Sequence, residues 1–115
     1  MIAYKRFYHC KISKNGNTNI IEYSAPIEKY GNYQPLSGYV DTLQYGENIS
    51  KRWRMFVPFA ELNEYSENDL LYLDGIAPDI NSENYINGDG ANARITAVLP
   101  QNRLVRIEIE QIIIK

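Results

Sequence analysis

Side chains that commonly carry catalysis are scarce in this chain of 115 residues, which holds one histidine and one cysteine. His9 and Cys10 are adjacent, and neighbouring side chains on a strand point to opposite faces. By themselves they therefore cannot form a Cys–His nucleophile pair. The sequence also contains no phosphate-binding glycine loop ahead of a helix and neither the HExxH nor the GxSxG motif. We expect no catalytic residues, no cofactor and no enzymatic activity.

Acidic residues are plentiful, but their spacing does not predict a metal site. The segment Asp79–Asn92, DINSENYINGDGAN, carries side chains of the kind that bind calcium. An EF-hand loop needs glycine at its sixth position and glutamate at its twelfth, where this segment has Asn84 and Gly90. We interpret it as a turn-rich polar loop that binds no metal. We interpret four other acids as solvated loop residues: Glu64, Glu67, Asp69 and Asp74.

The tightest basic cluster, Lys51, Arg52 and Arg54, surrounds the only tryptophan, Trp53. A basic, aromatic strand can bind single-stranded nucleic acid in an OB-like barrel. Alternation along a strand, however, places Trp53 opposite Arg52 and Arg54, so that base stacking and charge would not act on one face. The alternative is that Trp53 lies in the core, while the two arginines contact acids of a neighbouring strand or of another subunit.

Short strands position these residues. Tyr4–Ser13 and Thr18–Tyr23 are typical of a hairpin, because the KNGN sequence at Lys14–Asn17 favours a tight turn. Trp53, Met55 and Val57 fall on one face of a predicted strand, and Pro58 is expected at the end of that strand or on a sheet edge. Further along the chain, the sequence predicts one helical turn within Phe59–Glu67, a strand at Leu70–Leu73 and a turn at Asp74-Gly75.

The chain closes with a predicted hairpin, Ala93–Leu99 and Leu104–Ile114, around Pro100–Arg103. Its second strand alternates cleanly, and four residues are expected to face the core: Val105, Ile107, Ile109 and Ile113. No segment shows a sustained helical period. The sequence therefore predicts an all-β fold, a small antiparallel β-barrel or sandwich, in a single domain spanning residues 1–115.

Ser24–Asn48 differs from the rest of the chain, because two prolines and three glycines interrupt it and neither structural period is sustained. We expect a long protruding loop here, since a connection of this length is usually functional or disordered. Tyr30, Tyr33, Tyr39 and Tyr45 lie within it. We expect these rings to pack either on the barrel or on another subunit.

Charge and composition narrow the possible partners. The net charge is −2 and no basic tail is present, so sequence-independent duplex binding is not indicated. One cysteine excludes a disulfide within the chain. No apolar run approaches the roughly 20 residues of a membrane helix, and charge interrupts the start of the chain where a signal peptide would be apolar. We expect a soluble protein made in a cytoplasm, with no membrane partner.

The order of these elements resembles the head-closure proteins of long-tailed bacteriophages, also called stoppers or head–tail joining proteins. Three stretches carry the resemblance: GENISKRWRMFVP at Gly46–Pro58, ENDLLYLDGIAPD at Glu67–Asp79 and ITAVLPQNRLVRIEIEQI at Ile95–Ile112. They cover roughly the last two-thirds of the chain at the level of layout. The resemblance implies a small β-barrel or sandwich with a long loop that reaches out of it, and Ser24–Asn48 would be that loop.

The resemblance also implies a function at the head–tail interface of a virion. Such proteins assemble in the host cytoplasm as a ring beneath the portal and adaptor proteins, close the DNA channel and provide the tail attachment surface. Expected partners are portal or adaptor proteins, tail-terminator or tail proteins, further copies of the chain and packaged DNA. The expected contact residues are Tyr30, Tyr33, Tyr39, Tyr45, Arg52 and Arg54. The alternative is a small phage-encoded binding module, either an OB-like nucleic-acid binder or an inhibitor of a host protein.

Overall fold

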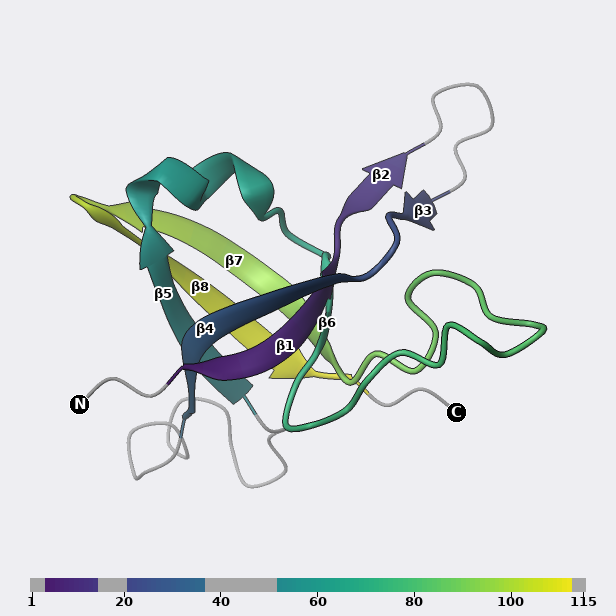
Figure 1. Cartoon of the computed structure of the whole chain (residues 1–115). Coiled ribbons are helices and arrows are strands. Elements are labelled where there is room, and N and C mark those ends of the chain that lie inside the picture. The colour runs from purple at the N-terminus through teal and green to yellow at the C-terminus, as the bar shows by residue number, and fades with distance from the viewer. Residues whose placement is uncertain (1–3, 15–20, 37–51, 113–115) are drawn as a thin grey trace.

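Six antiparallel strands close into a barrel in the computed structural model, which describes residues 4–14, 21–36 and 52–112. Around the barrel the order is β1–β4–β5–β8–β7–β6 (Figure 1). The prediction of a small all-β fold is confirmed, and the barrel is the correct alternative. The barrel strands are β1 (Lys5–Cys10), β4 (Ile27–Pro35), β5 (Arg52–Pro58), β6 (Leu70–Tyr72), β7 (Ala93–Gln101) and β8 (Leu104–Gln111).

The first predicted hairpin projects from this barrel as a separate two-stranded ribbon (Figure 1). It consists of β2 (Ile12–Lys14) and β3 (Ile21–Tyr23), which pair antiparallel. We call these two strands the ribbon. The pairing is as predicted, although part of the KNGN turn lies outside the described residues. Strand β1 continues into β2, so the single entry strand of the prediction is shared between barrel and ribbon.

The prediction of one long loop over Ser24–Asn48 is wrong in its first half, where β4 forms part of the barrel wall. The prediction took Gly31 as a sign of a loop. In the structure Gly31 lies within the strand, where its missing side chain lets Met55 and Phe7 pack close to the backbone. A Cβ atom on Gly31 would lie 2.9 Å from both the Sδ of Met55 and the Cε1 of Phe7. The rest of the predicted loop, residues 37–48, lies outside the described residues.

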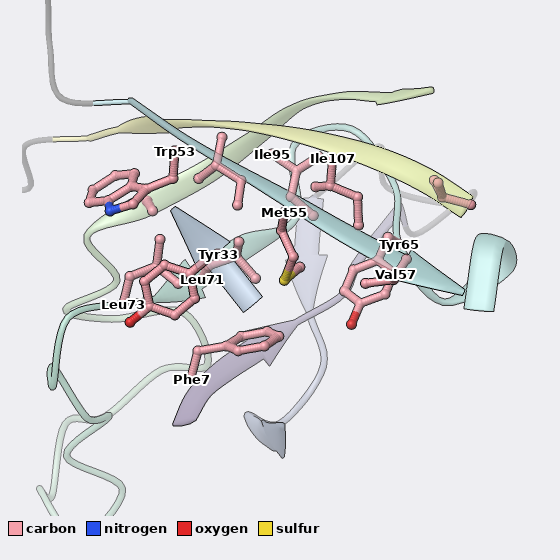
Figure 2. Close-up of a cluster of buried hydrophobic side chains, with 13 residues drawn as sticks. Phe7, Tyr33, Trp53, Met55, Val57, Tyr65, Leu71, Leu73, Ile95 and Ile107 are labelled. Atoms are coloured by element: carbon pink, nitrogen blue, oxygen red, sulfur yellow. The ribbon is translucent and has the colours of Figure 1, made fainter. Parts of the chain in front are cut away.

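The core fills the barrel, and β5 supplies its central side chains (Figure 2). Trp53, Met55 and Val57 are buried, while Phe56 between them is exposed, as alternation predicts. Trp53 is thus a core residue. The cluster contains Phe7, Tyr33, Trp53, Met55, Val57, Tyr65, Leu71, Leu73, Ala93, Ile95, Val105, Ile107 and Ile109.

The closing hairpin of β7 and β8 is also as predicted, with the inward side chains of β8 buried from Val105 to Ile109. Ile113, which was expected to join them, lies outside the described residues. A register shift between Ile95 and Ala97 inserts one extra residue into β7. Such a bulge bends and twists a strand, which assists closure of the barrel.

A short 3₁₀ helix, η1 (Phe59–Glu64), follows β5 and matches the predicted helical turn. Within the described part of the chain, no helix is long and apolar enough to cross a membrane.

Candidate functional site

Arg52 and Arg54 form ion pairs within their own barrel. Arg52 Nη1 lies 3.3 Å from Glu110 Oε2, and Arg54 Nε lies 2.9 Å from Glu108 Oε1. Both acids belong to β8, which is paired with β5 in this register. The sequence left open whether the two arginines contact acids of a neighbouring strand or of another subunit. In the barrel they contact acids of a neighbouring strand. A further contact of either arginine with another subunit stays a prediction.

The four tyrosines expected to make contacts do not form one surface. Tyr33 is buried, with its ring edge-on to Phe7 at a centroid distance of 6.2 Å, and its hydroxyl accepts a hydrogen bond from Asp74 N at 2.9 Å. Its assignment to an interaction surface is therefore wrong, because inward alternation on β4 places it in the core. Tyr30 is 64 % exposed on the outer face of the same strand. Tyr39 and Tyr45 lie outside the described residues.

His9 and Cys10 are both buried and lie in different surroundings, as expected for opposite faces of a strand. Cys10 packs with Tyr72 and Ala91 in a second, smaller cluster. Burial is the main reason that the pKa of the Cys10 thiol is raised. His9 lies over the ring of Tyr65, with centroids 4.9 Å apart.

Asp69 is the buried polar residue that the sequence analysis missed. We interpreted it as a solvated loop acid, but its side chain is fully buried. Its carboxylate accepts hydrogen bonds from His9 Nε2 at 2.7 Å, from Ile12 N at 2.9 Å and from Ser66 N at 2.8 Å. These bonds tie together the point where β1 leaves the barrel and the segment that precedes β6. No local pattern marks this role, because His9 is 60 positions away in sequence.

No metal site emerges from the described residues, since no three His, Cys, Asp or Glu side chains gather there. In the polar loop after β6, Asp89 instead caps its own turn. The Oδ2 atom of Asp89 accepts a hydrogen bond from Ile86 N at 3.0 Å, and its carbonyl oxygen accepts one from the Tyr72 hydroxyl at 2.7 Å. Asp89 thus holds part of the loop, through its side chain to the loop backbone and through its carbonyl oxygen to β6.

The most distinctive surface feature lies along β4, whose two halves have different neighbours. Ile27–Gly31 pairs with β1, whereas Asn32–Pro35 pairs with β5. The β4–β5 ladder ends at the pair formed by Asn32 and Phe56. The hydrogen bond from Leu36 N to Arg52 O shows that even-numbered residues of this strand point their backbone groups toward β5. By alternation, the N–H and C=O groups of Glu28 and Tyr30 point to the same side, toward the end of β5 and the η1 helix that follows it.

Two hollows lie between β4 and the segment formed by the end of β5 and η1, and together we call them the seam groove. One is a cavity of about 410 Å³ whose wall includes Tyr4, Tyr30, Phe56, Pro58 and Leu104. The other, of about 370 Å³, is lined by His9, Lys11, Ile27, Lys29, Asn63 and Glu64. Both are lined by residues of β4 on one side and of η1 on the other.

The first hollow of the seam groove is lined mainly by apolar and aromatic side chains, whereas the second is lined mainly by polar ones. Tyr30 and Phe56 are exposed there at 64 % and 44 %, and Tyr4, Ile27 and Leu104 are also exposed. The exposed Tyr30 hydroxyl donates a hydrogen bond to Glu28 Oε1 at 3.1 Å. Large exposed apolar side chains that gather in one hollow are typical of surfaces that bind another protein.

Comparisons with known proteins found no family model, no curated protein and no solved structure that matches this chain.

Proposed function

We propose that the chain is a head-closure protein of a long-tailed bacteriophage. It assembles as a ring beneath the portal and adaptor proteins, closes the DNA channel and provides the surface to which the tail attaches. The proposal rests on the sequence resemblance, and one structural observation supports it: a small closed barrel carries a group of large exposed apolar side chains around one hollow on its outer face. A subunit of a ring needs such a surface for its neighbours.

The alternative of an OB-like nucleic-acid binder has less support. A single-strand binder stacks bases on exposed aromatic rings within a basic groove. Here Trp53 is 1 % exposed, and Arg52 and Arg54 are ion-paired with Glu110 and Glu108. The aromatic rings of the seam groove lie beside Glu61, so that this end of it has no cluster of basic residues to match them.

The test is to purify particles of the phage that carries this chain and to measure the chain in them by quantitative mass spectrometry. We expect it in a fixed ratio to the portal protein, as a ring requires. Particles assembled without the chain should package DNA but fail to retain it or to accept tails. Intact infectious particles that lack the chain would overturn the proposal and favour an inhibitor of a host protein.

A further inference from the structure

Four arginines surround two glutamates on the outer face of β5, β8 and β7, and we call this surface the arginine face. Its members are Arg52, Arg54, Arg94, Arg106, Glu108 and Glu110. Glu110 lies opposite Arg52 on one side and Arg94 on the other, and it forms ion pairs with both. Glu108 is shared in the same way by the other two arginines. Two acids therefore hold four arginines in place.

The arginine face presents positive charge, because its acids lie deeper than its bases. The side chains of Glu108 and Glu110 are 15 % and 23 % exposed. Those of Arg54 and Arg94 are 37 % and 44 % exposed. Four arginines and two glutamates give the face a net charge of +2. Phe56 adds an exposed aromatic ring to the same outer face, and arginine with aromatic residues is the composition enriched where proteins bind one another.

The loop of residues 74–92, which joins β6 to β7, carries the opposite charge, and we call it the acidic loop. It contains no lysine or arginine, and it holds four exposed acids: Asp74, Asp79, Glu83 and Asp89. Its net charge is therefore −4. Ile80 and Ile86 are exposed within it. The acidic loop extends away from the barrel at the lower right of Figure 1, whereas β5, β7 and β8 lie at the left.

A hollow in the acidic loop suits a guanidinium group. Its volume is about 210 Å³, and no residue that lines it carries a positive charge: Ala77, Asp79, Ser82, Asn84, Tyr85, Asp89 and Gly90. The guanidinium group of arginine is a planar fork of donors that matches the oxygens of a carboxylate. The two carboxylates of this hollow therefore favour an arginine side chain as its occupant.

We propose that the arginine face binds the acidic loop of a second copy of this chain, with one arginine side chain in the hollow beside Asp79 and Asp89. The occupant follows from charge complementarity, since each copy carries a face of charge +2 and a loop of charge −4. Nucleic acid suits this face less well, because the whole chain has a net charge of −2 and repels phosphate groups.

A contact between two different patches propagates from copy to copy and closes into a ring when the rotation allows. The inference thus deepens the proposed ring function, on which its role in a particle rests, by naming the contact that would build the ring.

The test uses two variants that each neutralise one surface. Arg54→Gln with Arg94→Gln weakens the arginine face and leaves each glutamate with one arginine, so that no carboxylate loses all its partners. Asp79→Asn with Glu83→Gln removes two charges from the acidic loop. Circular dichroism and thermal unfolding show whether each variant folds, and Arg94→Gln alone replaces the double arginine variant if that one does not.

Sedimentation velocity over a concentration series measures self-association. Wild-type protein should associate at about 0.1 M salt and dissociate at about 1 M, where the Debye length falls from about 10 Å to about 3 Å. Each variant should weaken association about tenfold, which corresponds to about 1.4 kcal/mol. A mixture of the two variants should form a one-to-one complex that grows no further, because it combines one intact loop with one intact face.

The matched control is Glu22→Gln with Glu67→Gln, which changes the net charge as much as the loop variant does, at exposed acids elsewhere. It should associate like wild-type protein. A wild-type protein that stays monomeric throughout the series at low salt would overturn the proposal. Self-association that the loop variant leaves unchanged, or a mixture that forms no complex, would also overturn it.

Single-stranded DNA of mixed sequence is the probe for the other class of partner. If a monomeric wild-type protein binds it and the double arginine variant does not, the arginine face binds phosphate groups and the proposal is wrong. The proposed function is tested separately. Absence of the chain from purified particles would overturn that function and leave the contact between copies to the mixing experiment.

Discussion

Replacing Asp69 with alanine should destabilise the protein far more than its position between two strands suggests. The substitution leaves three donors without their acceptor, namely His9 Nε2, Ile12 N and Ser66 N. A buried unsatisfied donor costs about 1–3 kcal/mol, which applies to His9, and the two partly buried amides lose about 1 kcal/mol each. The expected loss in the free energy of unfolding is therefore about 3–5 kcal/mol, against a total of roughly 5–15 kcal/mol for a domain.

Urea unfolding followed by Trp53 fluorescence measures this loss, since Trp53 is buried in the folded barrel. Asp79→Ala is the matched control, because that acid is exposed in the loop after β6. It should change the free energy of unfolding by less than about 0.5 kcal/mol. A double-mutant cycle with His9→Ala should give a coupling of about 1–3 kcal/mol between the two side chains. A loss below about 1 kcal/mol for Asp69→Ala would refute the reasoning that the carboxylate holds this junction together.

Three further perturbations follow from the core. Trp53→Ala should lower the free energy of unfolding by roughly 3–5 kcal/mol in the same urea assay, and Trp53→Phe by less. Gly31→Ala should cost about 1–3 kcal/mol in thermal unfolding through overpacking against Met55 and Phe7, and an unchanged melting temperature would contradict the close approach. Burial raises the pKa of Tyr65 in the folded protein. Its contribution to the free energy of unfolding is therefore fully present below the unfolded pKa of about 10 and is lost as the pH rises above it. Tyr65→Phe should reduce this alkaline loss when the free energy of unfolding is measured against pH.

Strands with a regular period could be predicted from the sequence, because alternation is a local property. β5 and β8 bury every second residue, and both the core position of Trp53 and the facing acids of Arg52 and Arg54 follow from that pattern. The pairing with Glu108 and Glu110 changes how those arginines must be tested. Reversing their charge alone would place acids opposite acids within the barrel, so a loss of assembly would not by itself identify an interface.

Two features could not be predicted, because they depend on contacts far apart in sequence. Asp69 carries no local sign of burial, and its role arises only when β1 and the segment before β6 are brought together. The strand β4 could not be predicted because it contains Gly31 and Pro35, which are typical of loops. Gly31 in fact allows Met55 and Phe7 to pack closely against the strand, and Pro35 is its last residue. The seam groove was hidden for the same reason, since residues of β4, β5 and η1 that are distant in sequence line it together.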